Sequence, residues 1–303
     1  CMPFGHGNEF FLYHQRDTRK PGPFGEPFGW DLATTSDFVH YKDCGVAVPR
    51  GTDVEQDQFI FAGSVFEAEG QYHIFYTGYN RDYPAQGKAS QVLMHAVSDD
   101  LYHWTKTQEA LTFTPQEGYG RTVKFTSTDL KNWKFEGDFW APGLFTMHEM
   151  VDLFQIGDWW YHVVTEYSDR SKMVYRMSKS INGPWIAPAD DAFDGRAYYA
   201  GRTFCLNGQR ILFGWVPTKE NSDDHANFEW AGTFVAHEIY QREDGTLGVK
   251  IPDTVWAAFN EREKIADFTI DSPYAREEKV VARECGDLFS FEADVKFSGD
   301  PRS

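Results

Sequence analysis

The chain has 303 residues, of which 41% are hydrophobic and 25% are charged, so a sizeable core is available to it. Lys and Arg number 29 against 46 Asp and Glu, which gives a formal charge of −17 at pH 7. This balance excludes the basic surface of a nucleic-acid-binding protein, and an anionic membrane surface would repel the chain. We therefore expect a neutral partner molecule, and neither nucleic acid nor a membrane. The sequence does not predict an oligomeric state.

Aromatic residues make up 17% of the chain, with ten Trp and fifteen Tyr. Such a content suits a surface that stacks against the apolar faces of sugar rings. The four cysteines lie far apart without a CxxC pair, which predicts free thiols. No apolar run approaches the roughly twenty residues of a membrane span, and no signal peptide is recognisable. We expect a cytoplasmic protein, or a secreted one if an upstream signal has been removed.

Short runs of aromatic and β-branched residues follow turn residues along the chain. Because these runs are short and bounded by Gly, Asn and Asp, they predict strands rather than helices. The clearest four occupy residues 8–13, 70–76, 157–164 and 208–215.

A second element recurs after most of these runs, with Ser or Thr, an acidic residue, an apolar residue and, further on, an aromatic one. It occupies residues 36–41, 98–104 and 127–133, with a looser copy at 178–185. Strands and polar turns that repeat without helical periodicity predict an all-β fold, namely a β-propeller in which each unit is one blade.

The spacing of the repeat reveals one short unit. The aromatic residues that close successive units lie 63, 29 and 52 residues apart, at Tyr41, Trp104, Trp133 and Trp185. The third unit therefore lacks roughly thirty residues, about half a blade. Either a segment is missing from the sequence between Tyr119 and Gly120, or the protein has been shortened there.

Two carboxylates, Glu149 and Asp152, come just before the run at 157–164. In an extended strand, Glu149 and Val151 would face one way while Met150 and Asp152 face the other. Glu149 would then be free to enter a pocket as a reactive group. Alternatively, both carboxylates are ordinary loop or capping residues.

Six parts of the chain match, in order and spacing, the motifs of one known family. The matching residues are 2–4 with 10–13, 29–41, 61–64 with 72–78, 149–154, 194–200 with 210–215, and Glu238 with 244–247. From Met2 to about Asn260 the chain thus resembles glycoside hydrolase family 32, the β-fructosidases. Glu-Met-Val-Asp-Leu-Phe at 149–154 resembles that family's acid/base motif, Glu-Cys-Pro-Asp-Leu-Phe.

The resemblance implies a five-bladed propeller over residues 1–262, followed at 263–303 by a linker and the first strands of a β-sandwich. It implies a retaining hydrolase that cleaves β-fructosidic linkages in sucrose, fructo-oligosaccharides or fructans. Such an enzyme needs two carboxylates roughly 5 Å apart and neither a metal nor a cofactor. Glu149 would be the general acid/base, which requires a raised pKa.

The same resemblance implies where the substrate binds. Its sugar pocket would be lined by Trp30, Phe61, Ser64, Tyr199 and Trp215, although each could instead be an ordinary core residue.

Two acidic neighbours have open roles. Asp31 could bond sugar hydroxyls or cap its strand, and Asp152 is expected to anchor the Glu149 segment rather than react. His148 is expected to be a hydrogen-bonding neighbour of Glu149, not a metal ligand.

The sequence also departs from the family pattern. The nucleophilic Asp of the family would lie just upstream of Cys1. The Arg-Asp-Pro motif that carries the stabilising Asp belongs in the short third unit, and no Arg-Asp-Pro occurs in the sequence. A carbohydrate-binding propeller without turnover, or another five-bladed glycosidase such as an arabinan-type enzyme, therefore remain alternatives.

A second Glu-Cys pair, Glu284-Cys285, imitates the acid/base motif. It opens the alternating run 289–297, which predicts an edge strand of the sandwich. We therefore do not expect Glu284 to be catalytic.

Overall fold

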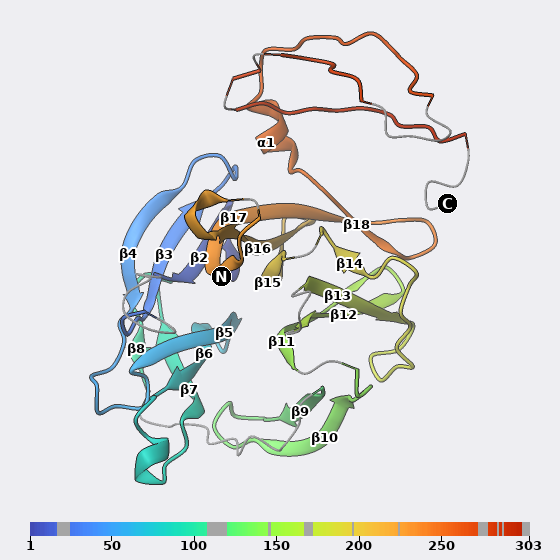
Figure 1. The fold of residues 1–303 in the computed structure, drawn as a ribbon. Coiled ribbons are helices and arrows are strands. Elements are labelled where there is room, and N and C mark those ends of the chain that lie inside the picture. Colours follow the sequence, from blue (N-terminus) through green and yellow to red (C-terminus); the bar gives the residue numbers. More distant parts are fainter. Residues whose placement is uncertain are drawn as a thin grey trace.

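The computed structural model describes residues 1–16, 25–107, 120–144, 147–166, 172–195, 197–223, 225–271, 278–283, 285–286 and 288–298. Within these residues the strands form four four-stranded sheets and one two-stranded sheet, all antiparallel. Figure 1 shows the sheets arranged in a ring, with the first sheet beside the last. The predicted all-β fold and propeller arrangement are confirmed.

Each complete sheet is built from consecutive strands. The first contains β1 (Met2–His6), β2 (Glu9–Gln15), β3 (Trp30–Thr35) and β4 (Lys42–Val48). The second contains β5 (Phe59–Ala68), β6 (Gln71–Tyr79), β7 (Gln91–Ser98) and β8 (Thr105–Lys106), with a 3₁₀ turn at Pro84–Gln86. The third sheet has only β9 (Thr122–Thr126) and β10 (Lys134–Trp140).

The last two sheets are again complete. The fourth contains β11 (His148–Ile156), β12 (Trp159–Glu166), β13 (Lys172–Ser178) and β14 (Ala192–Phe193). The fifth contains β15 (Tyr199–Leu206), β16 (Gln209–Lys219), β17 (Phe228–Gln241) and β18 (Leu247–Lys250), with a 3₁₀ turn at Glu220–Ser222. A short helix, α1 (Asp253–Ala257), follows.

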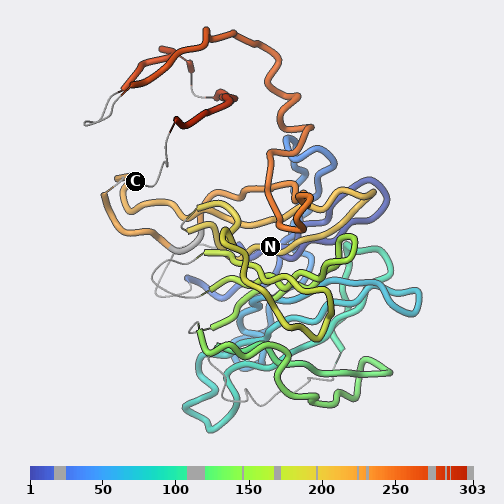
Figure 2. Tube along the Cα trace, turned by 90° about the vertical axis from the view of Figure 1, so that its right-hand side faces the viewer, coloured from blue at the N-terminus to red at the C-terminus, as the bar shows by residue number. Residues whose placement is uncertain are grey.

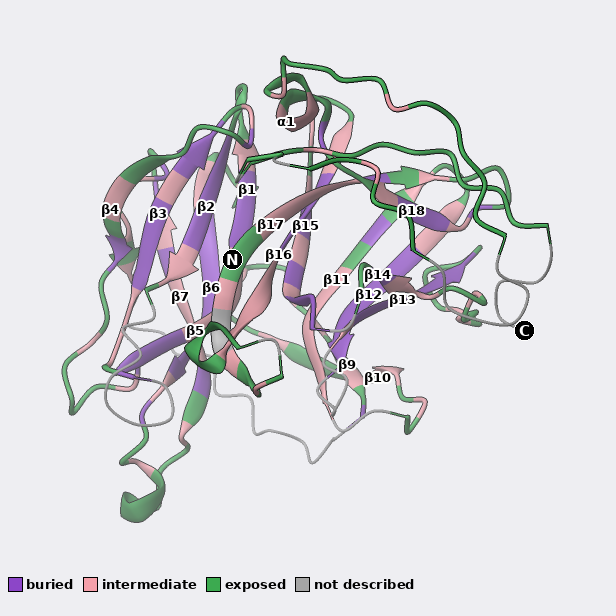
Figure 3. Ribbon diagram, turned by 45° about the horizontal axis from the view of Figure 1, so that its top comes forward, coloured by how far each residue is buried: buried purple, intermediate pink, exposed green. Residues whose placement is uncertain are grey.

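The four aromatic runs in the sequence form the second strands of the complete sheets, β2, β6, β12 and β16. Six consecutive residues of β12, Tyr161 to Glu166, are buried. Such strands carry consecutive aromatic and β-branched residues rather than a strict alternation, because both of their faces are covered. Figure 3 shows the long buried stretches of β2 and β3 in the first sheet.

The polar turn of the repeat joins the third and fourth strands of a sheet. It connects β3 to β4 and β7 to β8, and the same motif connects β9 to β10. The acidic residue of each copy accepts hydrogen bonds from two backbone N–H groups and from the side chain three positions on. The residues concerned are Asp37, Asp100 and Asp129. The turn therefore identifies β9 and β10 as the outer pair of the third blade.

The outer pair is held by aromatic contacts on both sides. The ring of Trp133 lies 5.4 Å from Phe75 of the second sheet, and the ring of Trp140 stacks 4.7 Å from His148 of the fourth. Neither β9 nor β10 contains a buried residue. Among the described residues the third sheet has two strands where each other sheet has four, which agrees with the predicted short third unit. The junction of Tyr119 with Gly120 lies outside the described residues, because Tyr119 is not among them.

Packing between the first and fifth sheets closes the ring. Phe10 and Leu12 of β2 and Phe38 form one buried cluster with Ile211 and Phe213 of β16. The rings of Phe10 and Phe213 lie 5.3 Å apart. The two ends of the repeat therefore join through side chains rather than through a shared strand.

The C-terminal region is predicted to hold the first strands of a β-sandwich. No strand is present among the described residues after Lys250, and the edge strand expected at 289–297 stays a prediction. A strand exists only through hydrogen bonds to a neighbour, and the described residues provide none here. Figures 1 and 2 show this region as an extended segment beside the ring. The division at 262/263 stays a prediction.

No helix in the described part of the chain is long and apolar enough to cross a membrane.

Candidate functional site

The first strand of each complete sheet lies nearest the centre of the ring and is called its inner strand. Three inner strands, β5, β11 and β15, carry a β-bulge where they approach the centre. The pairing slips between Ile60 and Gly63 in β5, between Glu149 and Asp152 in β11, and between Tyr199 and Arg202 in β15. A bulge leaves residues of one strand unpaired and lets consecutive side chains face the same side. Two consecutive residues from each strand accordingly line one central cavity: Phe61 with Ala62, Glu149 with Met150, and Tyr199 with Ala200.

The bulge overturns the expected alternation around Glu149. Met150 adopts a φ of 51°, which breaks the regular pleat, so both Glu149 and Met150 line the cavity. Asp152 is not among the described lining residues; its Oδ2 accepts the backbone N–H of Thr203 at 2.7 Å. That contact agrees with its expected role as an anchor.

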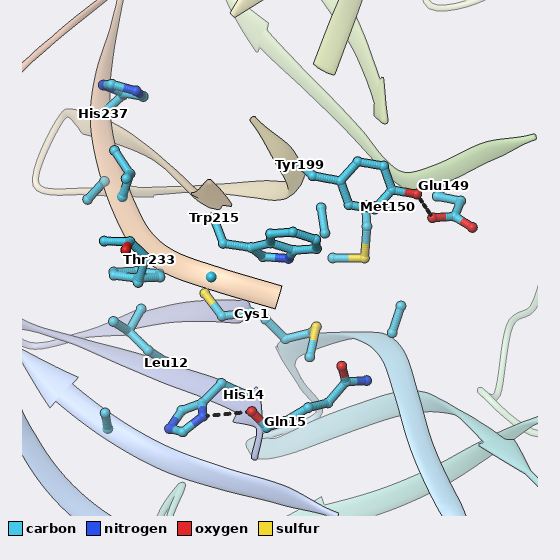
Figure 4. Close-up of a pocket in the computed structure, with 18 of the residues that line it drawn as sticks. Cys1, Leu12, His14, Gln15, Glu149, Met150, Tyr199, Trp215, Thr233 and His237 are labelled. Atoms are coloured by element: carbon cyan, nitrogen blue, oxygen red, sulfur yellow. Dashed lines mark hydrogen bonds between the residues drawn. The ribbon is translucent and has the colours of Figure 1, made fainter. Parts of the chain in front are cut away.

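The central cavity has a volume of about 2160 Å³ and opens between the first, second, fourth and fifth sheets. Figure 4 shows Glu149, Met150, Tyr199 and Trp215 around it, with Cys1 and His14 from the first sheet. Aromatic side chains supply much of its wall: Phe28, Tyr41, Phe61, Tyr79, Tyr199, Trp215, Phe228, Phe234, Trp256, Phe259, Phe289 and Phe291. A wall of this kind suits apolar ring faces.

Glu149 is a largely buried carboxyl group at the cavity wall, and its pKa is raised. Burial raises its pKa, and a hydrogen bond donated by the Tyr199 hydroxyl to Oε2 acts in the opposite direction by stabilising the carboxylate. Figure 4 shows this bond between two residues of the cavity wall. Burial has the larger effect, so Glu149 stays protonated up to a higher pH than an exposed glutamate would.

His148 stacks on Trp140, and its Nδ1 lies 3.2 Å from the Thr122 hydroxyl of the third sheet. Burial, reinforced by the charge of Arg176, lowers its pKa to about 4. A neutral imidazole at this position adds no positive charge beside Glu149. The hydrogen bond of its Nδ1 goes to Thr122, so the role of His148 as a hydrogen-bonding neighbour of Glu149 stays a prediction.

Three of the predicted sugar-contacting residues line the cavity. Tyr199 and Trp215 face each other across the β15–β16 ladder, with their rings 5.2 Å apart. Phe61 comes from the second sheet and packs edge-on against Phe28, 5.5 Å away. The second and fifth sheets thus both present aromatic surface to the cavity.

Trp30 does not line the cavity. Its side chain is fully buried between Tyr13 and Tyr76, and its indole N–H donates to the Phe61 carbonyl at 3.1 Å. The prediction of direct sugar contact by Trp30 is therefore corrected to a structural role. The family resemblance placed Trp30 at the pocket but could not show that the second sheet covers its ring.

The remaining two predicted contacts also lie away from the described lining residues. Asp31 is buried and forms an ion pair with Arg16, whose Nε lies 2.5 Å from its Oδ2. The Ser64 hydroxyl accepts a hydrogen bond from Arg202 at 2.7 Å. Neither residue is among the described lining residues, and each is engaged with a guanidinium.

Sequence reasoning missed Met150, Ala200 and Arg202. The first two have positive φ values of 51°, which no residue pattern predicts for Met or Ala. Arg202 sits in an otherwise ordinary strand, and its cross-sheet bonds involve residues far away in the sequence.

Two further predictions concern a metal site and the second Glu-Cys pair, Glu284-Cys285. In the described part of the chain, no group of three or more His, Cys, Asp or Glu side chains could hold a metal ion. Glu284 lies outside the described residues.

The fold and the cavity define a β-propeller with a protonatable carboxyl group in an aromatic central pocket. The chain belongs to glycosyl hydrolases family 32: the model of that family's N-terminal domain matches residues 2–124 and 114–244.

Among curated proteins, the chain is 23% identical over 305 residues to a sucrose-6-phosphate hydrolase of Escherichia coli, covering 85% of this chain and 63% of that protein. It spans between about half and two thirds of the length of the relatives that it matches.

Two solved structures share the fold. A GH32 β-fructofuranosidase of Bombyx mori, BmSUC1, superposes with a TM-score of 0.66 at 18% identity, over 86% of this chain and 63% of that one. An exo-1,5-α-L-arabinanase from a bovine ruminal metagenomic library superposes with a TM-score of 0.58 at 12% identity, over 82% of this chain and 95% of that one.

Proposed function

We propose that this chain carries the propeller of a retaining β-fructosidase in which Glu149 is the general acid/base. The observation that carries the proposal is the position of Glu149: a buried carboxyl group with a raised pKa, at the wall of an aromatic cavity. Protonated, it would donate to the leaving oxygen; deprotonated, it would activate the water that releases fructose.

The nucleophile of this mechanism is the Asp expected just upstream of Cys1. Support comes from Cys1, which lines the same cavity as Glu149, so a residue before it would adjoin the cavity. Attack by that carboxylate on the anomeric carbon would form a covalent fructosyl–enzyme intermediate while the glycosidic bond breaks.

We further propose that an inner strand pair completes the third sheet and makes the propeller five-bladed. The turn between β9 and β10 supports this, because the same turn joins outer strands in the first two sheets. The family's stabilising Asp would sit on that inner pair, facing Glu149.

The substrate is proposed to be a neutral fructoside. Arg121 is the one Lys or Arg among the described lining residues, and it already pairs with Asp138 at 3.2 Å. A phosphorylated sugar is usually held by several cationic or N–H donors, which this wall does not offer. A free sugar needs aromatic surface and neutral hydrogen-bonding groups instead.

The test is the turnover of sucrose and of arabinan by the natural protein and by its Glu149→Gln variant. The amide keeps the shape but cannot transfer the proton, so kcat on sucrose should fall about 10²- to 10⁴-fold. Substrates with activated leaving groups should lose less. Glu284→Gln is the matched control and should keep full activity. Full activity of Glu149→Gln would disprove the assignment.

The second candidate is a carbohydrate-binding propeller without turnover. The two-stranded third sheet favours it, since the inner pair would carry the stabilising carboxylate. Tight sugar binding without product would identify this function, and arabinose release would identify the arabinan-type enzyme.

A further inference from the structure

One guanidinium connects the inner strands of sheets that are not neighbours. Arg202 of β15 donates from Nη1 to the Gly63 carbonyl at 2.9 Å and from Nη2 to the Ser64 hydroxyl at 2.7 Å. Gly63 and Ser64 belong to β5, so the fifth sheet is bonded to the second. Arg202 and Gly63 each close the bulge of their own strand.

The strand between them is tightly packed. β1 contacts both β15 and β5, and a Cβ at Gly5 of β1 would lie 2.8 Å from Cε1 of Phe204 on β15. A Cβ at Gly63 would lie 2.3 Å from the Phe75 carbonyl oxygen. A side chain at position 63 would therefore not fit, and glycine lets the backbone that carries the acceptor carbonyl pack closely against β6.

The fourth sheet joins the same point through Asp152, which closes the bulge of β11. Its Oδ2 accepts the N–H of Thr203, the residue after Arg202. Burial lowers the pKa of the Arg202 guanidinium, and the charge of Asp152 counteracts that effect. The bulge of β15 is thus tied to the fourth sheet at Thr203 and to the second at Arg202.

Tyr199 stands at the other end of this bulge, three residues before Arg202, and donates to Glu149. We propose that Arg202 is a positioning residue, which fixes the β15 bulge against the second sheet and thereby holds the Tyr199 hydroxyl on Glu149. Only the catalytic consequence rests on the proposed function; the geometric link does not.

Arginine is suited to this role because its planar fork binds two acceptors at once. Lysine could reach one acceptor but could not fix the plane. Glutamine would lose the positive charge as well, and with it the electrostatic interaction with Asp152.

The described side chains that share the cavity with Glu149 also bear on its titration. Its direct partner is Tyr199, and His148 precedes it on β11. The other titratable or charged lining groups are Cys1, His14, Tyr41, Tyr79, Arg121, Glu220, Glu229 and His237. None of these is changed in the variants below.

The experiment measures the titration of Glu149 directly, by NMR of protein labelled with ¹³C at the glutamate carboxyl carbon. The signal that disappears in Glu149→Gln identifies the residue. Arg202→Gln should raise the pKa of Glu149, because the Tyr199 hydrogen bond, which lowers that pKa, loosens. Ser64→Ala removes one of the two bonds of Arg202 and should raise the pKa less.

Arg210→Gln is the matched control. Arg210 is also electrostatically coupled to Asp152, but its side-chain bond goes to the Thr203 hydroxyl within its own sheet, at 2.7 Å. It should leave the pKa of Glu149 unchanged. In the natural enzyme, Arg202→Gln should lower kcat about 10- to 100-fold with little change in KM, as displaced catalytic groups do.

An unchanged Glu149 titration in Arg202→Gln, or an equal rise in Arg210→Gln, would overturn the proposal. If Arg202→Gln does not fold, as judged by circular dichroism, Ser64→Ala and Arg202→Lys take over the test with the same criterion. A rise in pKa in a protein that hydrolyses no fructoside would support the positioning role while refuting the proposed function.

Discussion

The Tyr199 hydroxyl donates a hydrogen bond to the carboxylate of Glu149, across the boundary between the fifth and fourth sheets. The two residues are brought together by bulges on β15 and β11 rather than by a common strand. Burial and this bond affect the protonation of Glu149 in opposite directions.

Tyr199→Phe should move the alkaline limb of the pH–rate profile to higher pH. The bond stabilises the carboxylate, so its loss leaves burial unopposed and raises the pKa of Glu149 further. The measurement is kcat against pH with a fructoside substrate. Tyr198→Phe is the control, because the Tyr198 hydroxyl donates only to the Leu212 and Val235 carbonyls. A limb that stays in place in Tyr199→Phe would contradict the prediction.

Truncation of Trp30 should mainly lower stability, whereas truncation of Trp215 should mainly lower sugar affinity. Trp30→Ala removes a fully buried side chain and should cost about 3–5 kcal/mol of unfolding free energy. Trp215→Ala should weaken sugar affinity roughly tenfold with a smaller loss of stability, because its ring lines the cavity. Chemical denaturation and calorimetric titration measure the two effects. A stable Trp30→Ala variant that has lost sugar affinity would reverse the assignment.

Acid should destabilise the fold through His162. This residue is fully buried among Phe139, Trp140 and Trp185, and burial lowers its pKa to about 3. Below an unfolded-state pKa of about 6.5 the unfolded chain binds the proton first, so stability is lost as pH falls from about 6.5 toward 3.

Between pH 7 and pH 5 this group should lower the unfolding free energy of the natural protein by up to about 2 kcal/mol. His162→Phe should remove that loss. The apolar ring suits the aromatic surroundings. Urea unfolding of both proteins at the two pH values is the measurement, and the exposed His225→Gln serves as control. Equal acid sensitivity of His162→Phe and the natural protein would refute the prediction.

Peptide mapping should find an additional segment between Tyr119 and Gly120 in the natural protein. The repeat period predicts about thirty residues there, with Arg-Asp-Pro on an inner strand. A peptide in which Tyr119 is joined directly to Gly120 would exclude the segment and favour the binding-module alternative.

The overall fold could be predicted because the second strands are buried on both faces and so appear as aromatic runs. The repeated turn showed the short third unit for a similar local reason, since Asp129 bonds only within a few residues. The site was harder to predict. Glu149, Phe61, Tyr199 and Trp215 were found through family motifs, whereas the inward or outward direction of Trp30 depends on how the second sheet covers it.

Arg202 could not be predicted for the same physical reason. Its partners, Gly63 and Ser64, are more than a hundred residues away, and their meeting depends on ring closure. The strand predicted at 289–297 has a different limit, because an alternating pattern specifies a strand only where a neighbouring strand is available.

The three bulges have an evolutionary consequence. Phe61, Met150 and Ala200 lie at positions where the ladder hydrogen bonds are already interrupted. A substitution there changes the chemistry of the pocket without removing a ladder bond, so new specificities can arise while the sheets stay intact. Divergence of substrate preference on this scaffold should therefore concentrate in a few unpaired residues of the inner strands.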